Sequence, residues 1–372
     1  HAPAKKVNPA RLIKFIAFKK PFEESIFTEY LLRIKEAKKV VSNNIFRVYP
    51  ITVQDIKKAG TEYESEAQKE MIGNYVGDKW GGKYLRAPDI FFTILEKGKG
   101  KFVKLGDIAD VRRGFTTGAN EFFYLTDAQA KEWKIESEFL KPVIKSPREC
   151  KSILVNPKDL KYKIFICNKS KEELKGTNAL KYIKWGESEG FHKKPTVMNR
   201  KFWWQNPDFG SKMFMQMSYN DVFKFWYSEK QIRCDARLYT ISLKDKLDVY
   251  YLNSTFSAFF IELFGRANLG EGALDFKVYE AEQILVLDKS SIRKFMNETM
   301  FHRDIKSIFE ECGIDPKSKI PIEEQDPNPL PDRAELDKIV FDALGLTQDE
   351  CKDVYRAVCR LAWNRISTAK SV

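Results

Sequence analysis

The sequence has little of what a metal site, a disulfide framework or a membrane span requires. Its six cysteines are scattered without a Cys-x-x-Cys pair and only three histidines occur, which disfavours a zinc site and predicts reduced thiols in a cytosol. No apolar run approaches the ~20 residues that cross a bilayer, and the first residues lack the apolar stretch of a signal peptide. His192 and His302 are the only internal imidazoles, so a histidine-based hydrolase is also disfavoured. These absences predict a soluble, cytoplasmic protein.

Motifs for nucleotide and metal chemistry are missing too. The chain has neither the Gly-x-Gly-x-x-Gly pattern of dinucleotide sites nor the Gly-x-x-x-x-Gly-Lys-Ser/Thr pattern of phosphate-binding loops. Pro88-Asp89 followed by Glu96-Lys97 resembles a magnesium-dependent nuclease motif, but the lysine is one position too close. The adjacent carboxylates Glu310-Glu311 and Glu323-Glu324 are expected to be solvated surface. We therefore predict no catalytic, cofactor-binding or metal-ligating residue in this chain.

Positive charge is abundant and unevenly placed. The chain has 64 Lys and Arg against 52 Asp and Glu, a net charge of +12. Between Lys141 and Arg237 the counts are 21 and 10, so this segment alone carries a surplus of 11. The same segment holds four of the seven tryptophans: Trp185, Trp203, Trp204 and Trp226. Basic residues interleaved with aromatic ones indicate a phosphate-backbone binder, and a solvated basic face is the alternative. The pair Trp203-Trp204 either stacks at a DNA boundary or belongs to a core.

Apolar patterning predicts an α+β protein. The first part resembles a piece of an α/β unit, with strands at 12–18 and 45–49 and helical spacing over 21–41. A glycine-punctuated connector at 60–82 leads into a helix at 88–97. An irregular β-rich module follows, with strands at 102–105, 164–167 and 284–287 and one helix at 247–265. The last part predicts a helical hairpin: one helix starts near Asp332 and stops at Gly345, and a capping box at 347–350 opens the next.

The most informative stretch is 104–125. Its first turn is anchored by apolar residues, and Arg112-Arg113-Gly114 and Thr116-Thr117-Gly118 then make a glycine-hinged loop. Two guanidinium groups, two hydroxyls and the amide of Asn120 are donors suited to phosphates and base edges. Taken in isolation, the stretch is also compatible with an ordinary strand-turn-strand.

This stretch also resembles the start of the target recognition domain in adenine-N6 DNA methyltransferases of restriction-modification systems, in the type IIG-like branch where methylase, specificity and sometimes endonuclease share one chain. Further family-like blocks occur in the family's order, one before this stretch at 81–90 and the others after it at 140–150, 182–187, 252–274 and 332–372. The resemblance covers most of residues 10–372. It implies four parts: a remnant of a methyltransferase α/β domain (1–58), a connector with a helix (59–100), a DNA target recognition domain (101–290) and a C-terminal helical segment (291–372).

One departure from the family limits the functional expectation. The family's S-adenosylmethionine-binding glycine motif is absent, and so is its Pro-Pro catalytic loop, because no two prolines are adjacent. The resemblance therefore implies a C-terminal fragment that is inactive alone, with S-adenosylmethionine the cofactor of the full-length enzyme and none in this chain. The implied partners are double-stranded DNA and a missing N-terminal methylase domain, with no membrane. A stand-alone specificity subunit and a nuclease remain alternatives, although no second copy of the 105–108 block occurs.

The candidate DNA-binding residues are cations and hydrogen-bond donors of the recognition segment. They are Arg112, Arg113, Thr116, Thr117, Asn120, Lys145, Arg148, Lys193, Lys194, Arg200, Lys201, Lys212, Arg233 and Arg237. Arg266 and Asn268 are weaker candidates, because the glycine-rich turn in which they lie is also compatible with a purely structural role.

Overall fold

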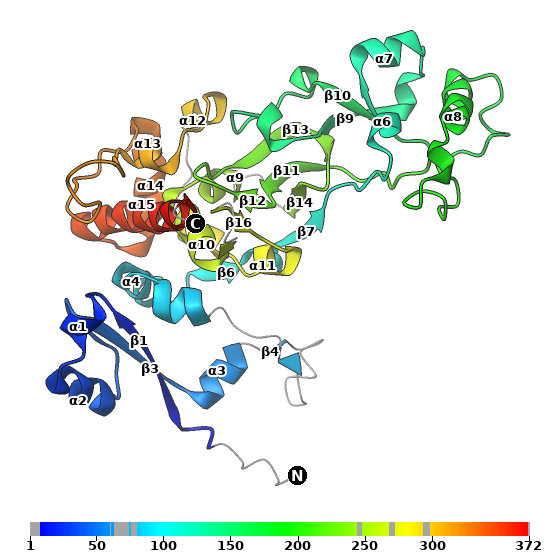
Figure 1. Ribbon diagram of the computed structural model, residues 1–372. Helices are drawn as coiled ribbons and strands as arrows, with labels where there is room; N and C mark the ends of the chain where they lie inside the picture. The colour runs from blue at the N-terminus through cyan, green and yellow to red at the C-terminus, as the bar shows by residue number, and fades with distance from the viewer. Residues whose placement is uncertain are drawn as a thin grey trace, which may run out of the picture. The chain divides into compact units, whose positions relative to one another are not determined.

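The computed structural model describes residues 8–59, 61–62, 74–75, 80–243, 248–267, 272–292 and 298–370 (Figure 1). The chain divides into two compact units, unit 1 (residues 1–95) and unit 2 (residues 96–372). Helices and strands occur in both units, and unit 2 contains a seven-stranded mixed sheet, which confirms the predicted α+β class. Within the described ranges, no helix is both long and apolar enough to cross a bilayer.

Unit 1 is built on a short antiparallel sheet. Its strands are β1 (Leu12–Phe18), β2 (Val41–Ser42) and β3 (Phe46–Thr52), with β4 (Thr61–Glu62) and β5 (Asn74–Tyr75) paired separately. Strand β3 is central and pairs with β1 along its whole length. Ile34 and Ala37 of the intervening helical segment pack on Phe46 and Val48. The strands predicted at 12–18 and 45–49 are thus confirmed.

The helices of unit 1 correct one prediction and confirm another. They are α1 (Phe22–Ser25), α2 (Thr28–Glu36), α3 (Val53–Ala59), the π-helix η2 (Gly81–Arg86) and α4 (Asp89–Lys97). A single helix over 21–41 is wrong, because the extended backbone at Phe27 cannot continue the helical hydrogen-bond ladder from α1 into α2, and α2 already ends at Glu36. The helix predicted at 88–97 is confirmed as α4, with Ile90 and Phe91 buried.

Unit 2 contains a seven-stranded sheet in the order β7-β14-β11-β13-β9-β10-β8. The strands of the unit are β6 (Phe102–Lys104), β7 (Ala109–Arg113), β8 (Tyr124–Thr126), β9 (Leu140–Ile144), β10 (Tyr162–Phe165), β11 (Ser211–Gln216), β12 (Ser218–Tyr219), β13 (Phe225–Cys234), β14 (Leu238–Leu243), β15 (Arg266–Ala267), β16 (Leu274–Asp275) and β17 (Leu285–Leu287). The β13–β9 pair is parallel and the other pairs of this sheet are antiparallel. Strand β13 joins two halves, since it pairs with β11 on one side and, at its C-terminal end, with β9 on the other. The predicted strands at 102–105, 164–167 and 284–287 are confirmed as β6, β10 and β17 within two residues.

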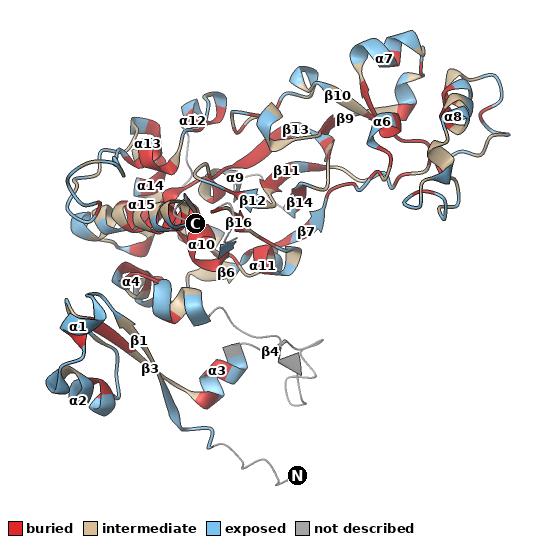
Figure 2. Ribbon diagram, viewed as in Figure 1, coloured by how far each residue is buried: buried red, intermediate tan, exposed pale blue. Residues whose placement is uncertain are grey.

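Helices gather at the two ends of this sheet (Figure 1). The α-helices of unit 2 are α5 (Leu105–Ile108), α6 (Asn120–Phe123), α7 (Asp127–Glu132), α8 (Asn178–Ser188), α9 (Asp248–Leu252), α10 (Thr255–Phe264), α11 (Val278–Glu282), α12 (Thr299–His302), α13 (Ile308–Cys312), α14 (Pro331–Leu344) and α15 (Gln348–Lys370). Short 3-10 turns are η3 (Ser137–Phe139), η4 (Pro147–Glu149), η5 (Pro157–Asp159), η6 (Phe191–Lys193) and η7 (Lys289–Ser291). Helix α10 is buried at every residue, as Figure 2 shows, and α14 and α15 pack on it.

The half of the sheet formed by β8, β9 and β10 carries its own core, here called the aromatic lobe (residues 115–209). Phe122 is fully buried and its ring lies 4.7 Å from Tyr182 and 4.6 Å from Trp203. Gly186 of α8 is required there, because a Cβ at this position would lie 2.6 Å from Trp203 and 2.7 Å from Phe122. Trp203 and Trp204 are both buried, so of the two alternatives for this pair the structure supports the core.

The predicted C-terminal hairpin is confirmed. Helix α14 ends at Gly345, whose φ of 68° suits glycine, and the Thr347 hydroxyl accepts from the Glu350 amide at 3.3 Å at the start of α15. The single helix predicted over 247–265 is wrong. The side-chain amide of Asn253 bonds both backbone groups of Phe225 in β13, and this interruption divides the segment into α9 and α10.

One expected surface carboxylate is in the interior. Glu310 is exposed as predicted, but Glu311 is only 1% exposed and its carboxylate accepts hydrogen bonds from Arg303 and Arg333. The prediction failed because both arginines come from other segments of the chain.

Candidate nucleic-acid interface

Several candidate residues meet where strands of the seven-stranded sheet end. We call this place the strand-end junction and define it as residues 112–121, 144–149, 194–200 and 233–237. Backbone hydrogen bonds tie its segments together: the Phe115 amide donates to Cys234 at 2.8 Å, the Ala236 amide to Phe115 at 2.9 Å and the Asp235 amide to Ile144 at 2.9 Å. Residues more than a hundred positions apart in the sequence thus share one small region.

Two glycines allow the chain to pass through the junction. At Gly114 a Cβ would lie 2.3 Å from the Asp235 carbonyl oxygen, which no side chain tolerates. Gly118 has a φ of +76°, and a Cβ there would lie 2.8 Å from Thr196. The glycine hinges expected from the sequence therefore have a physical cause, which is close backbone approach at the first and left-handed backbone at the second.

Three arginines point outward at this junction. Arg112 and Arg113 end β7, and Arg237 lies in the turn between β13 and β14. Each is exposed and weakly held: Arg112 pairs with exposed Asp110 at 2.8 Å, and Arg113 donates to the Ala236 carbonyl at 3.1 Å. Exposed contacts of this kind contribute little energy, so the three guanidinium groups are available to a ligand.

A lysine at the end of β9 is held over two aromatic rings. The Lys145 ammonium lies 4.1 Å from the ring centre of Tyr162 and 5.1 Å from that of Tyr124. The Tyr124 hydroxyl donates to Asp235 at 2.7 Å, and burial together with this bond raises the pKa of Tyr124. Sequence reasoning missed Asp235 of the junction and its neighbours Tyr124 and Tyr162, and no local pattern links them because they lie on the β13–β14 turn, β8 and β10.

Other candidates also lie in the junction. Arg148 is exposed in η4, Thr116 is exposed in the loop that follows β7, and Asn120 is exposed at the start of α6. Lys194 pairs with Glu121 at 3.1 Å; the backbone N–H of Glu121 and this ion pair lower the pKa of the Glu121 carboxyl.

Two candidates are already bonded to the protein itself: Thr117, which is buried, and Arg200, which is half-buried. Thr117 is 2% exposed and its hydroxyl donates to Oδ1 of Asn120. The guanidinium group of Arg200 donates to four protein oxygens, two of which belong to Thr116 and Thr117. The Thr117 hydroxyl and both terminal nitrogens of Arg200 are thus already engaged, so we leave both residues out of the proposed DNA-contacting surface.

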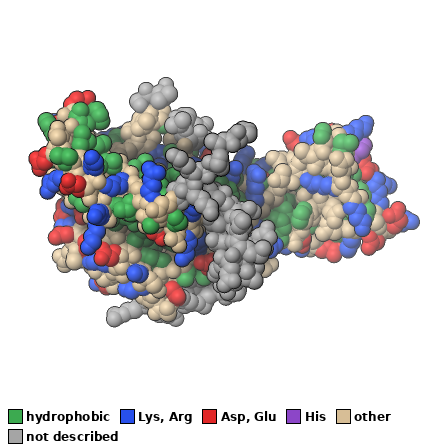
Figure 3. All heavy atoms as spheres, turned by 90° about the horizontal axis from the view of Figure 1, so that it is seen from below, with side chains coloured by type: hydrophobic (Ala, Val, Ile, Leu, Met, Phe, Trp, Pro, Cys, Tyr) green, Lys and Arg blue, Asp and Glu red, His purple; other side chains and the backbone are tan. Residues whose placement is uncertain are grey.

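The remaining candidates lie outside the junction or are already paired. Exposed residues among them are Lys193, Lys201, Lys212 and Arg266, and Arg266 pairs with Glu280 at 3.0 Å. Arg233 pairs with Asp208 at 2.6 Å and its side chain is 13% exposed. Asn268 lies outside the described residues. The face of unit 2 seen in Figure 3 shows Lys and Arg side chains spread over the aromatic lobe, with some Asp and Glu among them.

Two of the three charged residues of the nuclease-like feature, Asp89 and Lys97, are engaged elsewhere. Lys19 and Arg47 pair with the Asp89 carboxylate at 2.5 and 2.8 Å. Burial raises the pKa of Asp89, but these hydrogen bonds outweigh it and the pKa is lowered overall. The Lys97 ammonium pairs with Glu350 at 2.5 Å. In the part of the chain that the structure describes, no group of three His, Cys, Asp or Glu side chains is placed to hold a metal ion.

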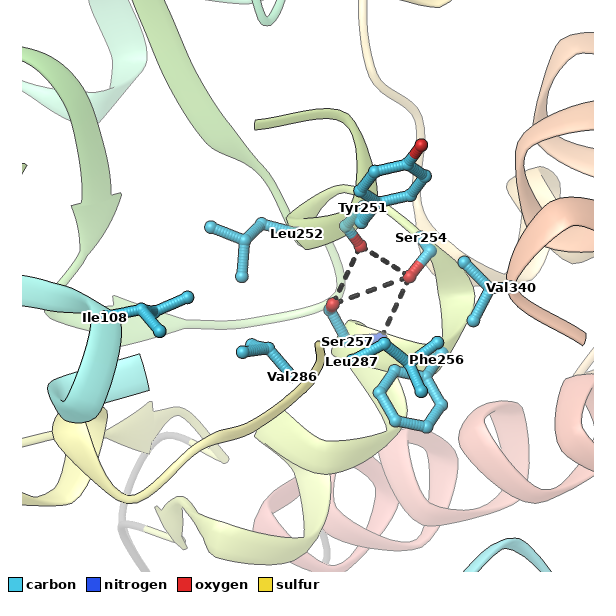
Figure 4. Close-up of a pocket in the computed structure, with 9 residues that line it drawn as sticks. All are labelled: Ile108, Tyr251, Leu252, Ser254, Phe256, Ser257, Val286, Leu287 and Val340. Carbon is cyan, nitrogen blue, oxygen red and sulfur yellow. Dashed lines mark hydrogen bonds between the residues drawn. The ribbon is translucent and has the colours of Figure 1, made fainter. Parts of the chain in front are cut away.

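A small apolar cavity lies beside α10 and has a volume of about 20 Å³ (Figure 4). Space of this size holds about one water molecule. The two serine hydroxyls in its wall, from Ser254 and Ser257, both donate to the Tyr251 carbonyl, at 2.6 and 2.9 Å. This cavity does not fit S-adenosylmethionine, and the sequence has no glycine-rich motif for it.

Comparisons with known proteins relate this chain to type II methyltransferases. The family model for the C-terminal domain of type II methyltransferase M.Eco57I matches residues 77–315. Type II methyltransferase M.AccI of Acinetobacter calcoaceticus is 27% identical over 204 residues, which cover 49% of this chain and 35% of that protein.

Two solved structures are similar as well. The type IIG restriction endonuclease BpuSI aligns with a TM-score of 0.55 and 10% identity, over 96% of this chain and 40% of its own. The type IIL restriction-modification enzyme MmeI, solved with DNA, aligns with a TM-score of 0.43 and 14% identity, over 88% of this chain and 44% of its own, which is too distant to carry an argument. The chain spans less than half the length of each of these relatives.

Proposed function

Because the chain belongs to the family of the C-terminal domain of type II methyltransferase M.Eco57I, a family of restriction-modification methyltransferases, we propose that it is the DNA-specificity part of such an enzyme. In this proposal it binds double-stranded DNA in a sequence-specific way and positions it for methylation of an adenine amine. The methylation itself is assigned to a domain outside this chain, where S-adenosylmethionine supplies the methyl group. We place the enzyme in a prokaryotic cytoplasm.

The observation that carries the proposal is the strand-end junction. It gathers exposed Arg112, Arg113 and Arg237 beside the outward donors Thr116 and Asn120. Guanidinium forks and amide groups on closely tied loops are the donors that read base edges in a DNA groove. Exposed lysines nearby, such as Lys193 and Lys201, supply charge for phosphates and carry no sequence information. No observation favours the stand-alone subunit or the nuclease over this assignment.

A salt titration tests the proposal. We expect the chain to bind random-sequence duplex DNA with an affinity that falls steeply as salt rises, because each neutralised phosphate releases counterions. Lys201→Ala should weaken binding to all sequences alike and lower the salt slope by about one unit. Lys317→Ala, another exposed lysine of unit 2 outside the junction, is the matched control and should leave the slope unchanged.

Two outcomes would contradict the proposal. A flat response between low and physiological salt would remove DNA as the ligand. Methyl transfer to DNA by this chain alone, in the presence of S-adenosylmethionine, would show that the catalytic part is not missing.

A further inference from the structure

The loop that presents Thr116 and Asn120 is held by one half-buried arginine, Arg200. Its Nη2 donates to the Thr117 carbonyl at 2.8 Å and to the Thr116 carbonyl at 3.2 Å. These two bonds join segments 84 and 83 residues apart. The conformation of the loop backbone at these two residues therefore depends on a side chain that lies far away in the sequence.

The other terminal nitrogen of the Arg200 guanidinium is also held by hydrogen bonds. Nη1 donates to the Gln205 carbonyl and to Oδ1 of Asn206, both at 2.9 Å. Asn206 is fully buried, so this end of the contact is anchored in the interior. The Phe123 ring lies 5.6 Å from the Arg200 Cζ atom and covers the group from the side of α6. Only a planar group with several donors can satisfy four oxygens in this arrangement, and a lysine cannot.

Two smaller contacts act on the same loop. The Thr196 hydroxyl donates to the Gly118 carbonyl at 2.8 Å, next to the buried Val197 that anchors the segment in the aromatic lobe. The Thr117 hydroxyl donates to Oδ1 of Asn120 and so fixes the orientation of the exposed amide. Loop backbone and Asn120 side chain are thus held in place without any ligand.

We propose that Arg200 is a positioning residue that holds loop 114–120 in one conformation for reading DNA and does not itself contact the DNA. The inference rests on the proposed function, and it assigns part of the sequence specificity to a side chain outside the contacting surface. A loop ordered in advance loses less conformational entropy on binding, and its donors meet only the base pattern that matches their fixed positions. The competing assignment is that Arg200 contacts a phosphate or a base directly, as the sequence alone suggests.

The first experiment needs no DNA. Hydrogen-deuterium exchange of a peptide covering residues 114–123 is measured in the full chain and in Arg200→Ala, Arg200→Lys, Thr196→Val and Lys201→Ala. We expect exchange to rise about tenfold in both Arg200 variants, less in Thr196→Val, and not at all in Lys201→Ala. If Arg200→Ala fails to give the wild-type circular dichroism spectrum, the other variants carry the comparison. Unchanged exchange in Arg200→Lys and Thr196→Val would overturn the proposal.

The second experiment measures sequence reading separately from charge. The wild type and the variants each select from a duplex library with a randomised centre, and salt slopes are measured on random-sequence duplex DNA. We expect Arg200→Ala and Arg200→Lys to lose at least tenfold in enrichment of the wild-type motif while Arg200→Lys keeps the wild-type salt slope. Lys201→Ala should keep the motif and lose about one unit of slope.

Failure of this inference and failure of the proposed function give different results. If Arg200→Lys selects the wild-type motif as well as the wild type does, Arg200 acts as a charge and the positioning role is wrong, although DNA binding stands. If the wild-type chain selects no motif and shows no salt dependence, the proposed function is wrong, and the exchange experiment still decides whether Arg200 holds the loop.

Discussion

Lys224 is a buried lysine whose positive charge destabilises the folded state. Its residue exposure is 8%, and its ammonium donates to the carbonyls of Cys150 and Lys151 at 2.7 and 3.0 Å. Burial lowers the pKa of Lys224 to about 8, an effect that the nearby Cys150 thiol and Asp304 carboxylate offset only in part. The two carbonyl bonds explain why a charged lysine is tolerated at this position, beside the buried Trp226 ring.

We predict that Lys224 makes stability rise with pH between about 8 and 10.5. In this window the unfolded chain still holds the proton that folded Lys224 has lost, so the free energy of unfolding increases with pH. The rise is at most about 3.5 kcal/mol, at about 1.4 kcal/mol per pKa unit. Denaturant unfolding of the wild type and of Lys224→Met is measured from pH 7 to 10.5. The difference between their free energies of unfolding reports the effect of Lys224, because the contributions of other titrating groups cancel.

The exposed Lys230 on β13 provides the control. Lys230→Met should leave the pH dependence of the wild type in place. A constant difference in stability between wild type and Lys224→Met across the whole range would refute the lowered pKa.

At the scale of elements, the C-terminal helices are joined to the rest of unit 2 by buried charge. Glu311 of α13 accepts from Arg303 at 2.6 Å and from Arg333 of α14 at 3.1 Å, and Arg303 also binds Asp332 at 2.6 Å. Arg333 is 2% exposed and donates in addition to the Asn253 carbonyl just before α10. The hairpin and the segment that precedes it are thus parts of one packed structure with α10, which hydrophobic spacing alone does not reveal.

We predict that Glu311→Gln destabilises unit 2 by about 3 kcal/mol, because it leaves the buried Arg333 guanidinium without its carboxylate. Burial raises the pKa of Glu311, but the bonds from Arg303 and the charge of Arg333 lower it further than burial raises it. This stabilisation is therefore fully present above the unfolded pKa of about 4.3 and is lost as pH falls through the lower folded value. Thermal unfolding from pH 7 down to pH 3 measures both effects.

The exposed pair Lys338–Asp342 on α14 is the matched control. Asp342→Asn should change stability by less than about 0.5 kcal/mol. Equal losses in the two variants would mean that the buried network contributes no more than a surface pair.

At the scale of the whole molecule, the two units differ in what they expose. Large apolar side chains are exposed mainly in unit 1: Leu12, Ile13, Phe18, Phe22, Ile26, Phe27, Leu31, Leu32 and Val40. Exposed apolar groups of this kind favour association in solution. The strand-end junction and its supports lie entirely in unit 2.

We predict that a fragment of residues 96–372 folds alone and keeps the DNA affinity of the full chain within about threefold, with the same salt slope. It retains the contacts of Lys97 with Glu350 and of Lys101 with Ala343 that hold its first residues. Circular dichroism, a thermal melt and the salt titration check the fragment. A folded fragment with a clearly lower salt slope would show that unit 1 contributes phosphate contacts.

Local signals predicted much of the fold and part of the junction. Strand β1, helix α4 and the stop at Gly345 follow from apolar spacing, caps and left-handed glycine, all of which act over a few residues. The long helices predicted at 21–41 and 247–265 failed, the first at the extended backbone of Phe27 and the second where a side-chain hydrogen bond outweighed the spacing. At the second break that bond joins Asn253 to Phe225 in another element, which no window of sequence contains.

The sequence by itself determined the α+β class, the family resemblance and the concentration of positive charge between Lys141 and Arg237, because composition, motifs and periodicity are properties of the chain before it folds. Only the tertiary structure decided which of the candidate donors face outward. Thr117 and Arg200 resemble Thr116 and Arg112 in chemistry, yet their donors bond to oxygens of the loop itself. The physical reason is that burial and hydrogen-bond partners depend on segments about a hundred residues apart, and the spacing of residues along the chain does not record them.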